Sequence, residues 1–332
     1  MPVNRSFERE LAVLESMSGH VPDAQEVAQV RKALGNSNNY LVAKAAKIAT
    51  EHNLNSLFPE VLVAFDRFFV DPVKDDPQCW AKIALAKALV KLGCQDAEVF
   101  LRGMRHHQEE PVWGGHSDTA GALRGTCAHA LVNCPQLSEA VLLNLLLEPL
   151  VDTDKTVRME AARAIGHVGS ESAELLIKLR ILLRKEDPEV LGACFSALLC
   201  MDRNKQAAIR LVADFLEDGE DAAAEAAYSL AETHDAMSLA ALISRRVKGC
   251  DPWFGSVLDN AIALTRLQEG MNYLLNVIER DPRQASSALE AISRVHHSPD
   301  VRERVAAAVH AARNERVLLA FRQYFPVIAR EA

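Results

Sequence analysis

The chain has 332 residues, of which 49% are hydrophobic, 25% charged and only 5% aromatic. This composition excludes a disordered chain, and the small numbers of glycine (15) and proline (13) argue against an all-β protein with many tight turns. The net charge of −8 is concentrated in residues 136–235, which hold 10 basic and 19 acidic side chains, so this region would repel nucleic acid and attract a basic partner.

Residues 1–21 form the first predicted element, a helix that caps the start of the fold, with Phe7, Leu11 and Leu14 on its inner face. This stretch carries charges where a signal peptide has an apolar core, and no apolar run approaches the roughly 20 residues that cross a bilayer. The seven cysteines form no CxxC pair, which favours reduced thiols over metal ligands. We therefore expect a cytoplasmic protein with no membrane contact, metal or cofactor.

A repeating pattern of small residues runs from residue 41 to residue 295. Its clearest copy is DTDKTVRMEAARAIGHVGS at residues 152–170, and seven other segments fit the same frame. Apart from one isoleucine, the residues aligned with Ala164 are Ala or Ser: Ile48, Ala88, Ala130, Ala164, Ala197, Ser229, Ala263 and Ala291. Their spacings of 28 to 42 residues leave room for two helices in each copy, which predicts an all-α solenoid of about eight helix pairs.

The segments between these copies supply the first helix of each pair. Residues 141–151, 173–185, 205–218 and 270–281 all have apolar residues at helical spacing. An aspartate stands 10 or 12 residues before the aligned small residue in five copies: Asp76, Asp154, Asp187, Asp251 and Asp281. Four of these precede a proline. An aspartate N-cap followed by proline in the first turn predicts the start of the second helix.

The D…VR…A-A…A-I-G pattern of residues 152–170 resembles a HEAT-type repeat, especially the short bacterial form seen in lyase-associated HEAT-like proteins. The resemblance covers roughly residues 22–297 and is strongest at 137–202. It implies a right-handed superhelix whose second helices line a concave face, and it implies a binding scaffold. The Val-Arg pair that contains Arg158 has one other match, at Leu123-Arg124, so a regular Asp–Arg ladder would be incomplete.

The 42-residue spacing between Ala88 and Ala130 marks an insertion, which we place as a loop at residues 106–118. One interpretation is a binding loop with Trp113 as an aromatic anchor. The candidate binding residues in and around this loop are Trp113, Gly114, Gly115, His116, Asp118, Arg124 and Arg158.

Two other interpretations of this insertion remain open. A metal site would draw on His106, Glu110, His116 and Asp118, although their spacing matches no known ligand pattern. Alternatively the loop is purely structural, with Trp113 folded back onto the core and Ser117 or Asp118 capping the next helix.

Residues 298–332 are predicted to form the C-terminal capping helices, which leaves residues 22–297 for the repeat array. The chain contains no phosphate-binding loop, no GxSxG elbow and no HExxH motif. We therefore expect a non-enzymatic scaffold that binds a protein or peptide partner on its concave face. The alternatives are a HEAT-like DNA-base glycosylase or other nucleic-acid-binding protein, and a lyase or chaperone-like accessory for a cofactor-bearing protein.

Overall fold

The structure is a computed structural model that describes residues 5–17, 19–201, 203–296 and 298–326. Parts of the predicted segments lie outside the described residues: 1–4 and 18 of the N-terminal cap, 297 of the repeat array and 327–332 of the C-terminal caps. The described chain is helical apart from one two-stranded hairpin, which confirms the predicted all-α helical-repeat fold. It divides into two compact units, residues 1–168 and 169–332, and each is described by itself.

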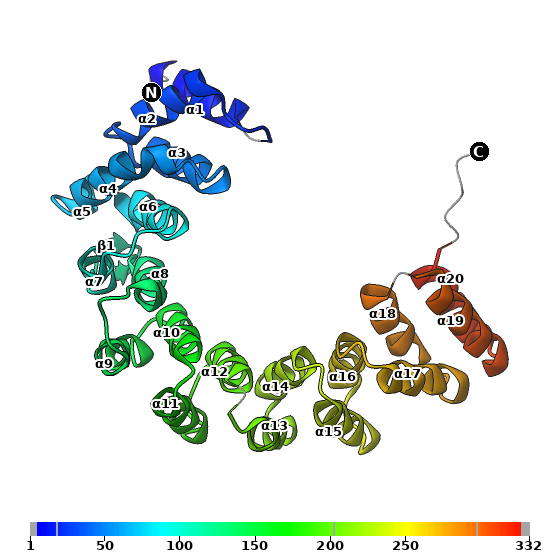
Figure 1. Cartoon of the computed structure of the whole chain (residues 1–332). Coiled ribbons are helices and arrows are strands. Elements are labelled where there is room, and N and C mark those ends of the chain that lie inside the picture. The colour runs from blue at the N-terminus through cyan, green and yellow to red at the C-terminus, as the bar shows by residue number, and fades with distance from the viewer. Residues whose placement is uncertain (1–4, 18, 202, 297, 327–332) are drawn as a thin grey trace, which may run out of the picture. The chain divides into compact units, whose positions relative to one another are not determined.

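Unit 1 is built from two rows of helices that alternate along the chain (Figure 1). Helices α2, α4, α7 and α9 form the first row, and α3, α6, α8 and α10 form the second. Neighbours within the second row pack directly against each other, and α1 contacts α2 and α3. The helices are α1 (Arg5–Ser16), α2 (Ala24–Leu34), α3 (Asn39–Glu51), α4 (Phe58–Arg67), α5 (Pro72–Asp75), α6 (Trp80–Lys91), α7 (Ala97–Met104), α8 (Gly121–Ala130), α9 (Glu139–Leu150) and α10 (Lys155–Val168).

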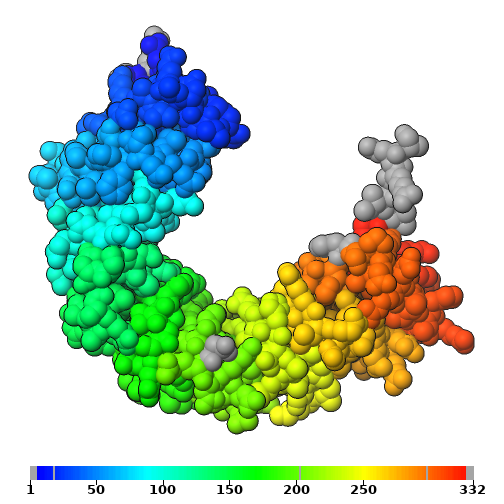
Figure 2. Space-filling model, in the orientation of Figure 1, coloured from blue at the N-terminus to red at the C-terminus, as the bar shows by residue number. Residues whose placement is uncertain are grey.

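Three short 3₁₀ turns and one hairpin complete unit 1. The turns are η1 (Asn55–Leu57), η2 (Pro77–Cys79) and η3 (Leu131–Asn133), and the hairpin consists of β1 (Glu109–Val112) and β2 (Gly115–Asp118). In the space-filling view the successive helix layers of this unit, coloured from blue to green, lie in contact with one another (Figure 2).

Unit 2 repeats the same arrangement, with α11, α13, α15 and α17 in the first row and α12, α14, α16 and α18 in the second. Helix α19 packs on α17, and α20 packs on α18, so the last two helices continue both rows. The elements are α11 (Glu171–Leu182), α12 (Pro188–Cys200), α13 (Lys205–Ala213), the 3₁₀ turn η4 (Asp214–Glu217), α14 (Glu220–Glu232), α15 (Ala236–Val247), α16 (Pro252–Leu264), α17 (Gln268–Arg280), α18 (Ala285–Val295), α19 (Pro299–Ala312) and α20 (Glu315–Tyr324).

The predicted column of small residues lies in the core of the second row. All eight of its members are buried: Ile48, Ala88, Ala130, Ala164, Ala197, Ser229, Ala263 and Ala291. Small side chains on one face let neighbouring helices approach closely, while larger apolar residues fill the layer between the two rows. The column therefore marks the face through which each second-row helix packs into the core.

The predicted aspartate caps are correct at some helix starts and displaced at others. Asp251 is the N-cap of α16 and accepts a hydrogen bond from the Phe254 amide at 3.0 Å. Asp187 occupies the N-cap position of α12, with a proline directly after it. Asp281 instead ends α17, and Asp76 precedes the 3₁₀ turn η2, so α6 begins only at Trp80.

Candidate functional site

The insertion after α7 forms a β-hairpin, where the sequence predicted a loop. β1 and β2 pair antiparallel from Glu109 opposite Asp118 to Val112 opposite Gly115. Trp113 and Gly114 are left as a two-residue turn, and Gly114 has a φ of +89°, a conformation that glycine adopts at little cost. The two glycines thus serve a tight turn and the start of β2.

Trp113 stands at the tip of this hairpin and is fully exposed, with a relative accessibility of 103%. The interpretation in which Trp113 folds back onto the core is therefore wrong. His116, in β2 opposite Pro111, is also exposed. A large exposed aromatic residue on an ordered turn is available as an anchor for another protein.

The base of the hairpin holds the remaining candidates in an internal network. Arg124 is 2% exposed and donates to the Asp118 carboxylate at 2.5 Å and to the two Asp152 carboxylate oxygens at 2.9 and 3.0 Å. Asp118 also accepts from the Gln108 and Ala120 amides, the second of which directly precedes α8. The structure brings Asp118 and Arg124 together to fix the hairpin on α8. Asp118 does not cap that helix as predicted, because the N-cap residue is Ala120 and no side chain of the described residues caps the first turn.

The pKa of Asp118 reflects these contacts. Burial acts to raise it, but the two amide hydrogen bonds and the Arg124 guanidinium outweigh burial and lower the pKa to about 2. Arg158 belongs to the same region, since it donates to the Asp152 and Thr153 carbonyl oxygens at 2.7 and 2.9 Å. Arg124 and Arg158 thus meet at Asp152, and neither is close to the exposed tip.

The residues considered for a metal site each have other contacts or are exposed, and they do not form a set of ligands. His106 contacts the Gln108 side chain at 3.1 Å, and His116 lies on β2 with its side chain exposed. Glu110 accepts from the Gln78 amide, the Gln108 side chain and the Thr119 hydroxyl at 2.6, 2.6 and 2.7 Å. Within the described ranges, no three His, Cys, Asp or Glu side chains are grouped so that they could hold a metal ion.

The hairpin is also tied to the start of α6. Gln108 donates to the Asp76 carbonyl oxygen at 2.9 Å, and Glu110 accepts from Gln78. Gln78 and Cys79 both have positive φ, 62° and 54°, which is unfavourable for residues with a Cβ. The hydrogen bond from the Gln78 amide to Glu110 helps to hold this conformation. The residues that follow directly begin α6, with Trp80 as its first residue.

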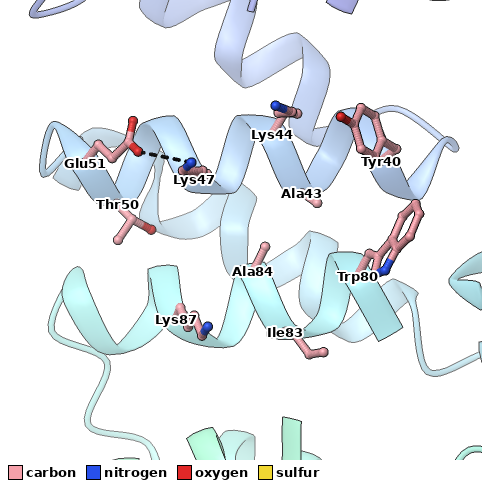
Figure 3. A pocket seen from close by; sticks show the side chains of 10 residues that line it. All are labelled: Tyr40, Ala43, Lys44, Lys47, Thr50, Glu51, Trp80, Ile83, Ala84 and Lys87. Carbon is pink, nitrogen blue, oxygen red and sulfur yellow. Dashed lines mark ion pairs between the residues drawn. The ribbon is translucent and has the colours of Figure 1, made fainter. Parts of the chain in front are cut away.

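A groove between α3 and α6 is the second exposed feature of unit 1, and sequence reasoning missed it. It has a volume of about 510 Å³ and is shown from close by in Figure 3. We call it the α3–α6 groove; it is lined by Tyr40, Ala43, Lys44, Lys47, Thr50, Glu51, Trp80, Ile83, Ala84 and Lys87. Trp80 is 46% exposed, so a large part of its ring is open to the groove.

The groove has an aromatic end and a basic end. Tyr40 and Trp80 lie side by side at the starts of the two helices, with ring centroids 5.8 Å apart in an edge-to-face arrangement (Figure 3). Lys47 and Lys87 lie about two turns further along, and Lys47 is 3.6 Å from the Glu51 carboxylate. Within the described part of the chain, Lys87 makes no ion pair or hydrogen bond.

A signal for this groove was present in the repeat frame. Tyr40 and Trp80 each stand eight residues before the aligned residue of their copy, Ile48 or Ala88, and Lys47 and Lys87 each stand one residue before it. Equivalent positions in neighbouring copies meet when the helices pack side by side. The pairing could therefore have been predicted from the frame, although the hollow between the helices could not.

In unit 2 the second-row helices α12 and α14 carry acidic side chains and no lysine or arginine. Burial, together with the nearby carboxylates of Glu189, Asp221 and Glu232, raises the pKa of Glu225. The acidic character predicted for the middle of the chain is thus partly located on α12 and α14.

The buried Asp259 of α16 has a different role, because it is fully paired. It accepts from Arg246 at 2.8 and 3.1 Å and from the Ser287 hydroxyl at 2.8 Å, which links α15, α16 and α18.

A comparison with known families identifies the type of helical repeat in one part of the chain. Residues 139–231, from α9 through most of α14, match the family described as HEAT repeats. The chain is a HEAT-like repeat protein. The match overlaps the segment in which the sequence resembles such repeats most strongly, and the paired rows extend the same helical pattern on both sides of it. A search of curated proteins found no match. Among the described residues, every helix is too short or too polar to cross a membrane.

Proposed function

We propose that this HEAT-like repeat protein is a non-enzymatic interaction scaffold that binds a protein or peptide partner on the exposed face of its second-row helices. The α3–α6 groove is the observation that carries the proposal. It combines an apolar floor, two partly exposed aromatic rings and three lysines on two packed helices. Peptide-binding grooves are built in this way, from apolar area for affinity and a few charges for specificity.

Two further surfaces fit the same proposal. The hairpin tip offers Trp113 as an anchor, with Gly114, Gly115 and His116 beside it. Asp118 and Arg124 fix the base of the hairpin, and Arg158 holds the adjacent turn at Asp152 and Thr153. In unit 2 the acidic side chains around Glu225 suit a basic segment of a partner. The free thiols fit a reducing compartment such as the cytoplasm, where we place the interaction.

The test is an unbiased selection of random displayed peptides on the immobilised full chain. We expect peptides enriched over those recovered on an unrelated immobilised protein. A photoreactive residue placed at Thr50, which lines the groove, should crosslink to the enriched peptides, whereas one at the exposed Lys74 should not. The absence of any enriched peptide overturns the scaffold proposal. A gel shift with duplex DNA tests the glycosylase alternative, and incubation with a tetrapyrrole followed by absorbance tests the accessory alternative.

A further inference from the structure

We propose that the α3–α6 groove takes an acidic peptide segment that carries one large apolar side chain. This inference rests on the proposed function and specifies the partner. It starts from the placement of charge, because the lining contains Lys44, Lys47 and Lys87 against the single carboxylate of Glu51. This local surplus of positive charge, in a chain of net charge −8, attracts negatively charged ligands to the groove.

The lysines differ in how far their charge is already used. Lys47 is 3.6 Å from Glu51, and Lys44 is 4.0 Å from Glu15 while lying 5.6 Å from the centre of the Tyr40 ring. These contacts are long and exposed, so they contribute little and can be exchanged for a ligand carboxylate. Lys87 also lines the groove and lies on α6 at the same level as Lys47 on α3 (Figure 3). The basic end can therefore bind the carboxylates of a ligand with lysines from both helices.

The apolar end sets the second requirement. The side chains of Ala43 and Ala84 are short and leave the floor open between the helices, and Tyr40 and Trp80 wall one end (Figure 3). An aromatic or long aliphatic side chain placed there would cover apolar surface that is now in water. Seven residues separate Tyr40 from Lys47 and Trp80 from Lys87, which is about 10 Å along a helix. An extended peptide covers that distance in about three residues.

A peptide fits these features better than a nucleic acid does. Nucleic-acid binding draws on many phosphate contacts, whereas the groove offers three lysines, no arginine and one carboxylate. The combination of few cations and a small apolar hollow matches a short segment with two or three carboxylates.

The experiment uses fluorescent peptides in anisotropy titrations with the full chain at two salt concentrations. One peptide carries a tryptophan three residues from a pair of glutamates, a second has the reverse order, and matched versions replace the glutamates by glutamine or lysine. A twelve-residue thymidine oligonucleotide serves as the nucleic-acid probe. We expect the glutamate peptides in at least one order to bind, the glutamine and lysine versions to bind at least about tenfold more weakly, and added salt to weaken binding.

Variants locate the contact. K47E/K87E should weaken the glutamate peptide by about tenfold, since two partly exposed attractions become repulsions. Ala84→Phe should weaken it without any change of charge, because the ring fills the floor of the groove. Lys74→Glu, on an exposed lysine outside the groove, should leave binding unchanged. Circular dichroism melting curves confirm that each variant is folded.

The outcomes separate this inference from the proposed function. Tighter binding of the oligonucleotide, equal binding of the lysine peptide, or full binding by both groove variants would overturn the acidic-segment assignment. If selected peptides still bind the chain in those cases, the scaffold proposal stands and the site lies elsewhere. If neither designed nor selected peptides bind, both proposals fail.

Discussion

The buried ion pair between Asp76 and Lys82 lies where α3 meets the start of α6, beneath the α3–α6 groove. The loss of stability on removing one of its charges can be calculated. Both side chains are 0% exposed, and the Lys82 ammonium lies 3.1 Å from the Asp76 carboxylate. The same carboxylate accepts from the Ala81 and Lys82 amides at 2.9 Å and from the Asn39 side chain at 2.9 Å, so it joins α3 to the start of α6.

Asp76→Asn keeps the size of the side chain and one acceptor but removes its charge. The Lys82 ammonium then remains buried, with the Phe68 carbonyl oxygen at 3.3 Å as its other hydrogen-bond partner. Removing one member of a buried ion pair typically costs about 3–5 kcal/mol, because the remaining charge is uncompensated. We expect the free energy of opening of α3 and α6 to fall by that amount. The double variant Asp76→Asn/Lys82→Met removes both charges and should be more stable than the single variant.

Amide hydrogen exchange followed by mass spectrometry is the suitable measurement, since a repeat array need not unfold in one step. Peptides from residues 39–51 and 80–91 report on the groove, and peptides from unit 2 provide the internal control. A loss below about 1 kcal/mol for Asp76→Asn would refute the reasoning. A double variant no more stable than the single one would refute it as well.

Three further predictions concern the hairpin and its surroundings. Folding lowers the pKa of Asp118 from 3.8 to about 2, so its carboxylate stabilises the folded chain by about 2 kcal/mol. This contribution is complete above about pH 4 and is lost as the pH falls toward 2. Asp118→Asn should remove this part of the acid unfolding curve, and superimposable curves for the variant and the original chain would contradict the prediction. In Gly103→Ala the new Cβ would collide with the buried Cys127 Sγ, so thermal unfolding should show a loss of about 1–3 kcal/mol that an added Cys127→Ala reverses. Trp113→Ala should change the free energy of unfolding by less than about 0.5 kcal/mol, and a larger loss in urea unfolding would mean that the ring packs on the fold.

Much of the fold followed from local pattern. Close packing requires small side chains on one face of each second-row helix, which gives the repeating column that contains Ala164 and Ala197. The structure confirms that the residues of this column are buried. The hairpin was missed because β1 and β2 are each four residues long, and only Pro111 and Val112 among their eight residues are apolar, apart from the glycine that starts β2. Such short strands carry no alternation strong enough to distinguish them from a loop.

By itself, the sequence determined which residues of each helix face inward, because helical periodicity and close packing act within one repeat. Only the tertiary structure decided which exposed residues became neighbours. Trp80 stands beside Tyr40, and Arg124 beside Asp152, because helices or turns from different copies lie next to each other. Whether a surface is hollow, and whether a charge is buried or available, depends on that juxtaposition, and no single repeat contains it.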